Sequence, residues 1–240
     1  ESKGGGGKMK KVELLFPELC NIYGESYNVE YLRRCSDEIE VINTNHMDTP
    51  AFVNEDVDMI YLGCTTERKQ EQIIGILSQY RDRIIELIDK GVIFLATGNA
   101  VEIFGNYIED AGRKIDALGI FDFYSVRYMS RDRHNSQFIG TFDDITVLGH
   151  RSQFSFAYGD FDDNFIDIQK GIGMNPDTKK EGVRRNNFYG TYSLGPFLIL
   201  NPLFAKKLMR IMGIDDTLCF EKEIVEAYEY RLTELNRTME

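Results

Sequence analysis

The chain has 240 residues, with 28 lysines and arginines against 39 aspartates and glutamates, so its formal net charge is −11. This charge excludes non-specific nucleic-acid binding and docking on anionic membranes, because both need a basic surface. No apolar stretch approaches the roughly 18 residues of a membrane-spanning helix, and a hydrophobic content of 42% is ordinary for a globular protein. At about 150 residues per domain, the length corresponds to one large or two small domains.

The cysteines are scattered, with no Cys-x-x-Cys pair and no histidine close by in the sequence. This pattern predicts neither a zinc site nor a disulfide framework. We therefore expect a cytoplasmic protein without a bound metal or cofactor. The four cysteines are Cys20, Cys35, Cys64 and Cys219.

The first eight residues contain four consecutive glycines and are interpreted as a linker or a cloning remnant. They are not a phosphate loop, because no strand precedes them. The remainder, residues 9–240, is predicted to be a single domain.

From Met9 to about residue 112, short apolar strands alternate with helical patterns, which favours βαβ units around a parallel sheet. The helix expected over 73–87 has apolar side chains at spacings of three and four, with a stop at Gly91. The run 92–96 is apolar throughout, as in a central strand covered on both faces. The predicted strands are 12–16, 39–42, 57–62 and 92–96, and the other predicted helices are 28–34 and 100–104.

After about residue 112 the pattern changes to short strand-like segments separated by turns. This predicts antiparallel or mixed sheet added to the first half, followed by two helices. The predicted strands are 138–142, 145–148, 165–168 and 187–192, and the helices are 201–212 and 221–235.

Two loops at the carboxyl ends of predicted strands are candidates for a ligand site, because open parallel sheets bind ligands at that edge. They are residues 63–66 and 97–99. The second loop has the strand–turn–helix context of a nucleophile elbow, but its central residue is Gly98. From this local pattern alone, an ordinary turn glycine is the favoured interpretation.

Motifs in the right order over about residues 12–212 resemble the cobyric-acid-synthase-like class I glutamine amidotransferases. Among them, the sequence resembles the amidotransferase subunit of lipid II isoglutaminyl synthase. Residues 94–105, FLATGNAVEIFG, look like the family's nucleophile segment, and residues 190–196, GTYSLGP, like its general-base segment. The resemblance implies a flavodoxin-like fold, with a largely parallel central sheet, helices on both faces and extra antiparallel strands. The other matching segments are 15–25, 28–34, 63–70, 149–153, 181–184 and 201–202.

Departures from the family pattern affect the expected activity. The resemblance places Gly98 where the family carries its nucleophilic cysteine and Leu194 where it carries its general-base histidine. Because glutamine hydrolysis needs a thiolate and a group that moves its proton, we expect a loss of about 10³–10⁶ in rate. In a third motif, Arg151 and Gln153 replace an acidic residue and a histidine. The sequence therefore predicts an inactive homologue that binds a partner or a small ligand.

An alternative is an active amidotransferase or hydrolase in cobalamin or peptidoglycan precursor amidation, with Cys64 as a relocated nucleophile. A free cysteine is more often an inert buried residue. Thr97 has no identifiable base, and a histidine such as His150 is more often structural. The resemblance also implies a Mur-ligase-like or synthetase partner that uses ATP. The expected pocket residues are Gly63, Cys64, Thr97, Gly98, Asn99, Gln153, Thr191, Tyr192 and Leu194.

Two charged clusters remain. The acidic run at 160–164 lacks the glycine and terminal glutamate of a calcium loop, so a solvated loop is favoured. A small basic patch at 179–185 is either a solvated turn or a contact for an anionic substrate or an acidic partner.

Overall fold

A six-stranded sheet forms the centre of the molecule, and the computed structural model describes residues 8–239. Five neighbouring strands pair in parallel, and the strand at one edge, residues 183–185, is antiparallel to its neighbour. The strand predicted from the apolar run at 92–96 lies inside this sheet and is buried along its whole length. In spatial order the strands are β13 (Val183–Arg185), β14 (Phe188–Thr191), β4 (Ile93–Thr97), β3 (Met59–Leu62), β1 (Lys10–Leu15) and β2 (Ile39–Thr44).

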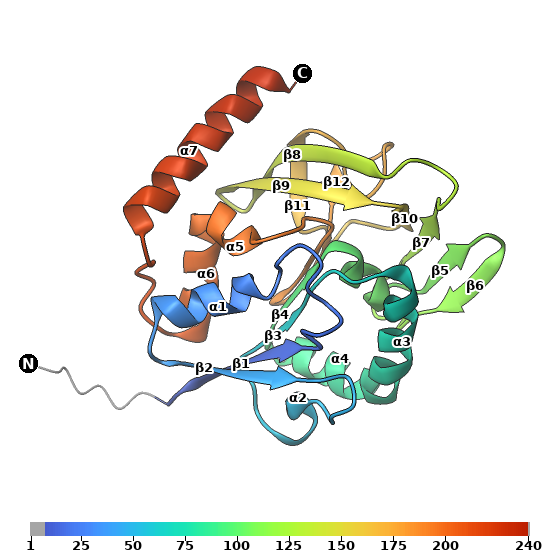
Figure 1. Cartoon of the computed structure of the whole chain (residues 1–240), viewed down its shortest axis with the longest axis horizontal. Helices are drawn as coiled ribbons and strands as arrows, with labels where there is room; N and C mark the ends of the chain where they lie inside the picture. Colours follow the sequence, from blue (N-terminus) through green and yellow to red (C-terminus); the bar gives the residue numbers. More distant parts are fainter. Residues whose placement is uncertain (1–7, 240) are drawn as a thin grey trace, which may run out of the picture.

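Helices cover both faces of this sheet (Figure 1), as expected for a flavodoxin-like α/β fold. Because side chains alternate along a strand, Phe94 and Ala96 join one hydrophobic core while Ile93 and Leu95 join the other. The first core is shared with α2 (Ala51–Asn54), α3 (Glu67–Leu77), α4 (Arg81–Asp89) and the 3₁₀ helix η2 (Gly98–Phe104). The second is shared with α1 (Tyr27–Cys35), α5 (Phe197–Leu200) and α6 (Pro202–Met212).

The single helix predicted over 73–87 is wrong in its extent, because the 3₁₀ turn η1 (Ser78–Tyr80) divides it into α3 and α4. Helix α3 begins earlier, where the Thr66 hydroxyl accepts a hydrogen bond from the backbone N–H of Lys69. Gly91, with φ +81°, follows the end of α4 as predicted. The helix predicted over 100–104 is the 3₁₀ helix η2.

Two smaller four-stranded sheets make up most of the second half. One consists, in spatial order, of β10 (Ser155–Gly159), β7 (Phe123–Arg127), β5 (Tyr107–Asp110) and β6 (Arg113–Asp116). The other consists of β12 (Lys180–Glu181), β11 (Ile166–Lys170), β8 (His134–Phe142) and β9 (Ile145–Gln153). Within the predicted segment 187–192, β14 joins the central sheet, parallel to β4 and antiparallel to β13.

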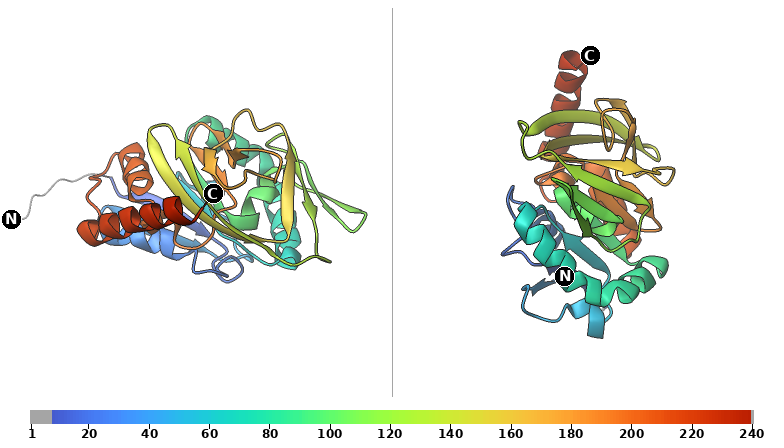
Figure 2. Two further views of the ribbon diagram at one scale, coloured as in Figure 1. Left: turned by 90° about the horizontal axis from the view of Figure 1, so that it is seen from above. Right: turned by 90° about the vertical axis from the view of Figure 1, so that its right-hand side faces the viewer.

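The last helix, α7 (Glu221–Thr238), lies along the outer side of the β8–β9 hairpin (Figures 1 and 2). It buries Leu235 against Ile139 and Leu148, while the Tyr228 hydroxyl donates to the backbone oxygen of Thr146. Within residues 8–239, none of the helices has the length and apolar character needed to cross a membrane.

Candidate functional site

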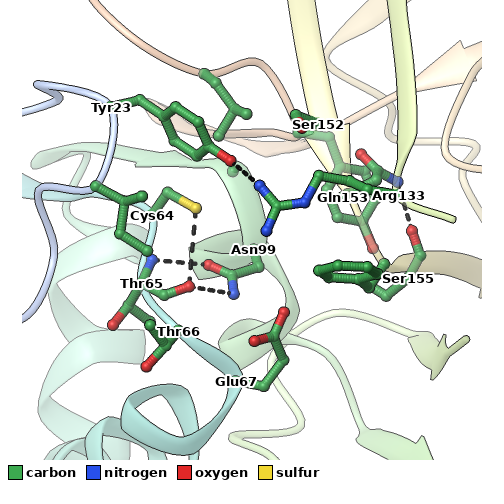
Figure 3. A pocket seen from close by; sticks show the side chains of 15 residues that line it. Tyr23, Cys64, Thr65, Thr66, Glu67, Asn99, Arg133, Ser152, Gln153 and Ser155 are labelled. Carbon is green, nitrogen blue, oxygen red and sulfur yellow. Dashed lines mark hydrogen bonds between the residues drawn. The ribbon is translucent and has the colours of Figure 1, made fainter. Parts of the chain in front are cut away.

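The two loops singled out in the sequence meet at the carboxyl edge of β3 and β4 (Figure 3). The Asn99 side chain joins them: its Oδ1 accepts from the backbone N–H of Thr65 at 3.0 Å, and its Nδ2 donates to the Thr65 carbonyl at 2.7 Å. This pair of hydrogen bonds fixes the distance between the loops. The site therefore lies where an open parallel sheet is expected to carry its ligand.

A cavity of about 70 Å³ lies between these loops, the residues around the β9–β10 connection and the segment after β14. This is well below the roughly 300 Å³ at which pockets for small molecules begin. Six of the nine expected pocket residues line it: Cys64, Gly98, Asn99, Gln153, Tyr192 and Leu194. The others found there are Ile22, Tyr23, Thr65, Thr66, Glu67, Arg133, Ser152, Phe154 and Ser155.

Gly63, Thr97 and Thr191, which were also expected in the pocket, do not line this cavity and pack at the strand ends. The hydroxyls of Thr97 and Tyr61 are hydrogen-bonded at 2.7 Å, and the Thr191 hydroxyl donates to the buried Glu181 at 2.9 Å. Gly63 lies against the chain before α1, where an added Cβ would come within 2.6 Å of the Cys20 carbonyl oxygen.

Gly98 and Leu194, which the family resemblance pairs, are in contact. A Cβ atom added to Gly98 would lie 2.6 Å from Leu194 Cδ2, 2.7 Å from Cys64 Cβ and 2.9 Å from Cys64 Sγ. Gly98 also has φ +62°, a left-handed conformation that costs other residues about 1–2 kcal/mol. The elbow geometry is thus present, but leucine and cysteine side chains occupy the space that a residue 98 side chain would need.

We expect Gly98→Ala to lower the free energy of unfolding by about 2–5 kcal/mol, because it combines left-handed strain with overpacking. Urea unfolding measures this loss. The matched control is Gly75→Ala in the interior of α3, where an added Cβ meets no atom within 4 Å. That substitution should stabilise the protein by about 0.5–1 kcal/mol. A Gly98→Ala variant as stable as the parent chain would contradict the packing described.

Cys64 lines the cavity but is 6% exposed, and burial raises the pKa of its thiol to about 12. Nearby carboxylates of Glu25 and Glu102 raise the pKa further. Its sulfur donates to the Thr65 carbonyl oxygen at 3.9 Å, and a hydrogen bond from the Asn99 backbone lowers the pKa without offsetting burial. No base contacts this thiol within residues 8–239. His150 is largely exposed and does not line this cavity; it lines a second groove that also includes Leu194.

A buried carboxylate that the sequence analysis did not identify supports the cavity from below. Glu102 is 1% exposed and accepts hydrogen bonds from Tyr192 Oη at 2.8 Å, Gln70 Nε2 at 2.8 Å and the Ser155 hydroxyl. Burial raises its pKa, although these donors act in the opposite direction. The sequence could have indicated Glu102, because a glutamate within the apolar run 100–104 is expected to be buried and therefore to need hydrogen-bond partners.

The residues of the third motif lie on β9. Arg151 is completely buried, with its Nη2 3.5 Å from the Oε1 atom of the equally buried Glu181. Gln153 lines the cavity and donates through Nε2 to the Ser155 carbonyl, while its buried Oε1 has no hydrogen-bond partner among residues 8–239. The two positions therefore differ in role, since one forms a buried ion pair and the other presents an unpaired amide oxygen.

Arg133 spans the mouth of the cavity from the segment before β8 (Figure 3). Its guanidinium lies 4.6 Å from the ring centroid of Phe154 and donates to the Tyr23 hydroxyl. No motif in the sequence indicated either Arg133 or Tyr23, because their proximity depends on how the β8–β9 hairpin packs over the first loop.

Glu25 lies beside Gly63 and has an exposed fraction of 0%. Its Oε2 accepts from the backbone N–H of Tyr23 at 2.8 Å, and its Oε1 has no hydrogen-bond partner in the described part of the chain. Burial raises its pKa, so the folded state keeps a proton that the unfolded chain has released. Its contribution to stability is therefore present below the unfolded pKa and lost as pH rises through the folded pKa.

Glu25→Gln is accordingly expected to gain stability relative to the parent chain as pH rises from about 4.5, the ordinary value for glutamate, to 8. Urea unfolding across this range measures the difference. Glu30→Gln is the control of opposite sign, because Arg33 and Arg34 lower the pKa of Glu30 to about 2. Glu30→Gln should slightly lower the free energy of unfolding at neutral pH. A stability difference between Glu25→Gln and the parent chain that does not change with pH would contradict the raised pKa of Glu25.

The remaining sequence candidates lie outside this site. Among residues 8–239 no group of three or more histidine, cysteine or acidic side chains could hold a metal ion. The acidic and basic clusters largely pair with each other and with neighbours, through Lys180–Asp162, Arg184–Asp143 and Arg185–Asp89. Cys20 is buried, and Cys35 accepts a hydrogen bond from the backbone N–H of Cys219. His46 contacts Glu18, and His134 contacts Ser136.

The geometry can be compared with known proteins. The model of the CobB/CobQ-like glutamine amidotransferase domain matches residues 11–201. The GatD subunit of lipid II isoglutaminyl synthase (glutamine-hydrolyzing) from Staphylococcus aureus is 27% identical over 187 residues, 75% of each chain. The same subunit from Streptococcus pneumoniae is 26% identical over 213 residues, 81% of this chain and 77% of the relative. A crystal structure of a glutamine amidotransferase has a similar fold, with a TM-score of 0.57 at 13% identity over 85% of this chain and 99% of that one.

Proposed function

Because the chain belongs to the CobB/CobQ-like glutamine amidotransferase domain family, we propose that it is a homologue that no longer hydrolyses glutamine and acts by binding a partner or a small ligand. The observation that carries this proposal is the packing around Gly98. A nucleophile's Cβ at this position would overlap Leu194 and Cys64, both within 2.7 Å.

Chemistry supports the same conclusion. Glycine offers no nucleophile, and the leucine side chain that touches it can neither accept nor donate a proton. The cavity of about 70 Å³ is smaller than sites that enclose a metabolite. The Asn99 side chain is engaged with the Thr65 backbone, and the Glu102 carboxylate behind the cavity is engaged with Gln70, so neither is free for a substrate.

The two relatives are GatD subunits of lipid II isoglutaminyl synthase (glutamine-hydrolyzing). We propose by extension that this chain docks on an ATP-using, Mur-ligase-like synthetase and contributes to amidation of peptidoglycan precursors without supplying ammonia itself. Copurification with such a synthetase encoded in the same genome tests this part.

A sensitive assay of ammonia release from glutamine tests the loss of hydrolysis. The purified chain is expected to release no more ammonia than a sample without protein, alone and with its partner. Release that depends on protein concentration would overturn the proposal. If Cys64→Ala abolished that release, the alternative with a relocated nucleophile would replace it.

We expect Cys64 to be chemically inert in the folded chain, because a thiol with a pKa of about 12 is about 10⁻⁵ ionised at pH 7. Alkylation by iodoacetamide, followed by mass spectrometry, should modify the half-buried Cys219 at least tenfold faster than Cys64. In urea the two rates should become similar. Fast modification of folded Cys64 would favour the alternative.

A further inference from the structure

A second groove lies next to the candidate site and shares Leu194 with it. Its volume is about 370 Å³, within the range of sites for small molecules. Leu194, Pro196 and Leu200 are apolar residues of its lining, and α7 borders it through Arg231. The other lining residues are Tyr23, Gln137, His150 and Gly195.

Strand register explains why polar groups converge there. Gln137 and His150 are paired across the β8–β9 hairpin, two residues from the pair Ile139 and Leu148. Because side chains alternate, both pairs lie on the same side of the hairpin, the side that α7 covers. The helix buries the apolar pair under Leu235 and, one turn earlier, places Arg231 beside the polar pair.

The charge in this groove is not balanced within the described part of the chain. Arg231 is half-buried and forms neither an ion pair nor a hydrogen bond with any residue from 8 to 239. The pKa of His150 is lowered by burial and by the Arg231 charge, and no carboxylate offsets either effect. The side chains of Gln137 and His150 also form no hydrogen bond in this range, so three polar groups remain available to a ligand. Partial burial of a guanidinium without an acceptor costs free energy. An unpaired arginine is unexpected in a chain of net charge −11, in which carboxylates are plentiful.

We propose that this groove binds a small organic carboxylate with an apolar body. The guanidinium of Arg231 receives the carboxylate, since its planar donors match the two oxygens, and Gln137 and His150 supply further donors. The apolar body lies against Leu194, Pro196 and Leu200. This groove shares Tyr23 and Leu194 with the candidate site, but Gln137, His150 and Arg231 do not line that site, and the proposal does not depend on the function proposed above.

Binding of 3-phenylpropionate to the full chain tests the proposal, with the amide and the amine of the same skeleton as probes that lack the negative charge. NMR is expected to show saturable shifts of the Leu194 and Leu200 methyl groups and the His150 imidazole with the carboxylate. The amide and the amine should bind at least tenfold more weakly. The bound carboxylate should also raise the measured pKa of His150.

Arg231→Gln should weaken carboxylate binding about tenfold or more, because it removes a charge-assisted hydrogen-bonded pair. Arg237→Gln on the same helix is the matched control, since Arg237 pairs with Glu234 in solvent, and it should bind as the parent chain does. Thermal unfolding verifies that both variants are folded. The proposal is overturned if the amide or the amine binds as tightly as the carboxylate, or if Arg231→Gln binds the carboxylate with unchanged affinity. It is also overturned if binding does not saturate at millimolar concentrations of the carboxylate, or if sedimentation detects a dimer whose interface covers the groove.

Discussion

Combining Gly98→Cys, Leu194→His and Cys64→Gly is expected to create a glutaminase at least about a thousandfold more active than the parent chain. The first two changes restore the thiol and the proton carrier that the family resemblance assigns to these positions. The third is required by the packing, because Cys64 Cβ would still lie 2.7 Å from a new Cβ at residue 98 after Leu194 has been replaced.

Release of ammonia from glutamine measures the gain, and mass spectrometry after reaction with a glutamine-like diazo ketone locates the modified cysteine. The matched control is Leu194→His with Cys64→Gly, which repacks the site but leaves Gly98 without a thiol, and it should remain inactive. Gly98→Cys alone should be inactive and destabilised, because the leucine and cysteine contacts persist. A folded triple variant without labelling at residue 98 would refute the assignment of these positions.

Arg151→Met is expected to lower the free energy of unfolding by about 3–5 kcal/mol, because it leaves the Glu181 carboxylate buried without its cation. For a chain of this size the midpoint of thermal unfolding should fall by roughly 10 °C. Differential scanning calorimetry and urea unfolding measure the two quantities. Arg151 also stacks over Phe138, 5.2 Å from its ring centroid, so methionine was chosen to keep the apolar contact.

Glu181→Gln in the Arg151→Met background separates the ion pair from the packing. The glutamine oxygen still accepts from the backbone N–H of Tyr192, but no charge remains to be balanced. The double variant should therefore recover stability, with a coupling energy of at least about 1 kcal/mol in the double-mutant cycle. Strictly additive losses would mean that the 3.5 Å contact contributes nothing beyond packing.

The fold class was predictable because hydrophobic periodicity is a local property of the chain. The apolar run at 92–96 became the buried strand β4, and Gly91 marked the end of the preceding helix. The break within the predicted helix 73–87 and the strands β5, β6, β7 and β10 were missed. They depend on pairing with distant segments, so their local patterns were weak.

The site was predictable in part. Family motifs led to Gly98, Leu194 and Cys64, and the elbow conformation at Gly98 follows from a glycine after a parallel strand. Arg133 and Tyr23 carried no signal, because they are 110 positions apart and meet through the packing of the β8–β9 hairpin. The ion pair of Arg151 with Glu181 was missed for the same reason.

The sequence alone determines which residues stand at the family's reactive positions. It therefore shows that this acidic chain lacks the thiol and the imidazole expected there for glutamine hydrolysis. Only the tertiary structure decided how the vacated space is used. The identity of a residue determines which reactions its side chain can perform. The overlap of an added Cβ at residue 98 with Leu194 and Cys64, in contrast, depends on residues that follow three different strands and meet at one edge of the sheet. Side-chain packing at that edge, a non-local property, explains why restoring a single residue is not expected to restore catalysis.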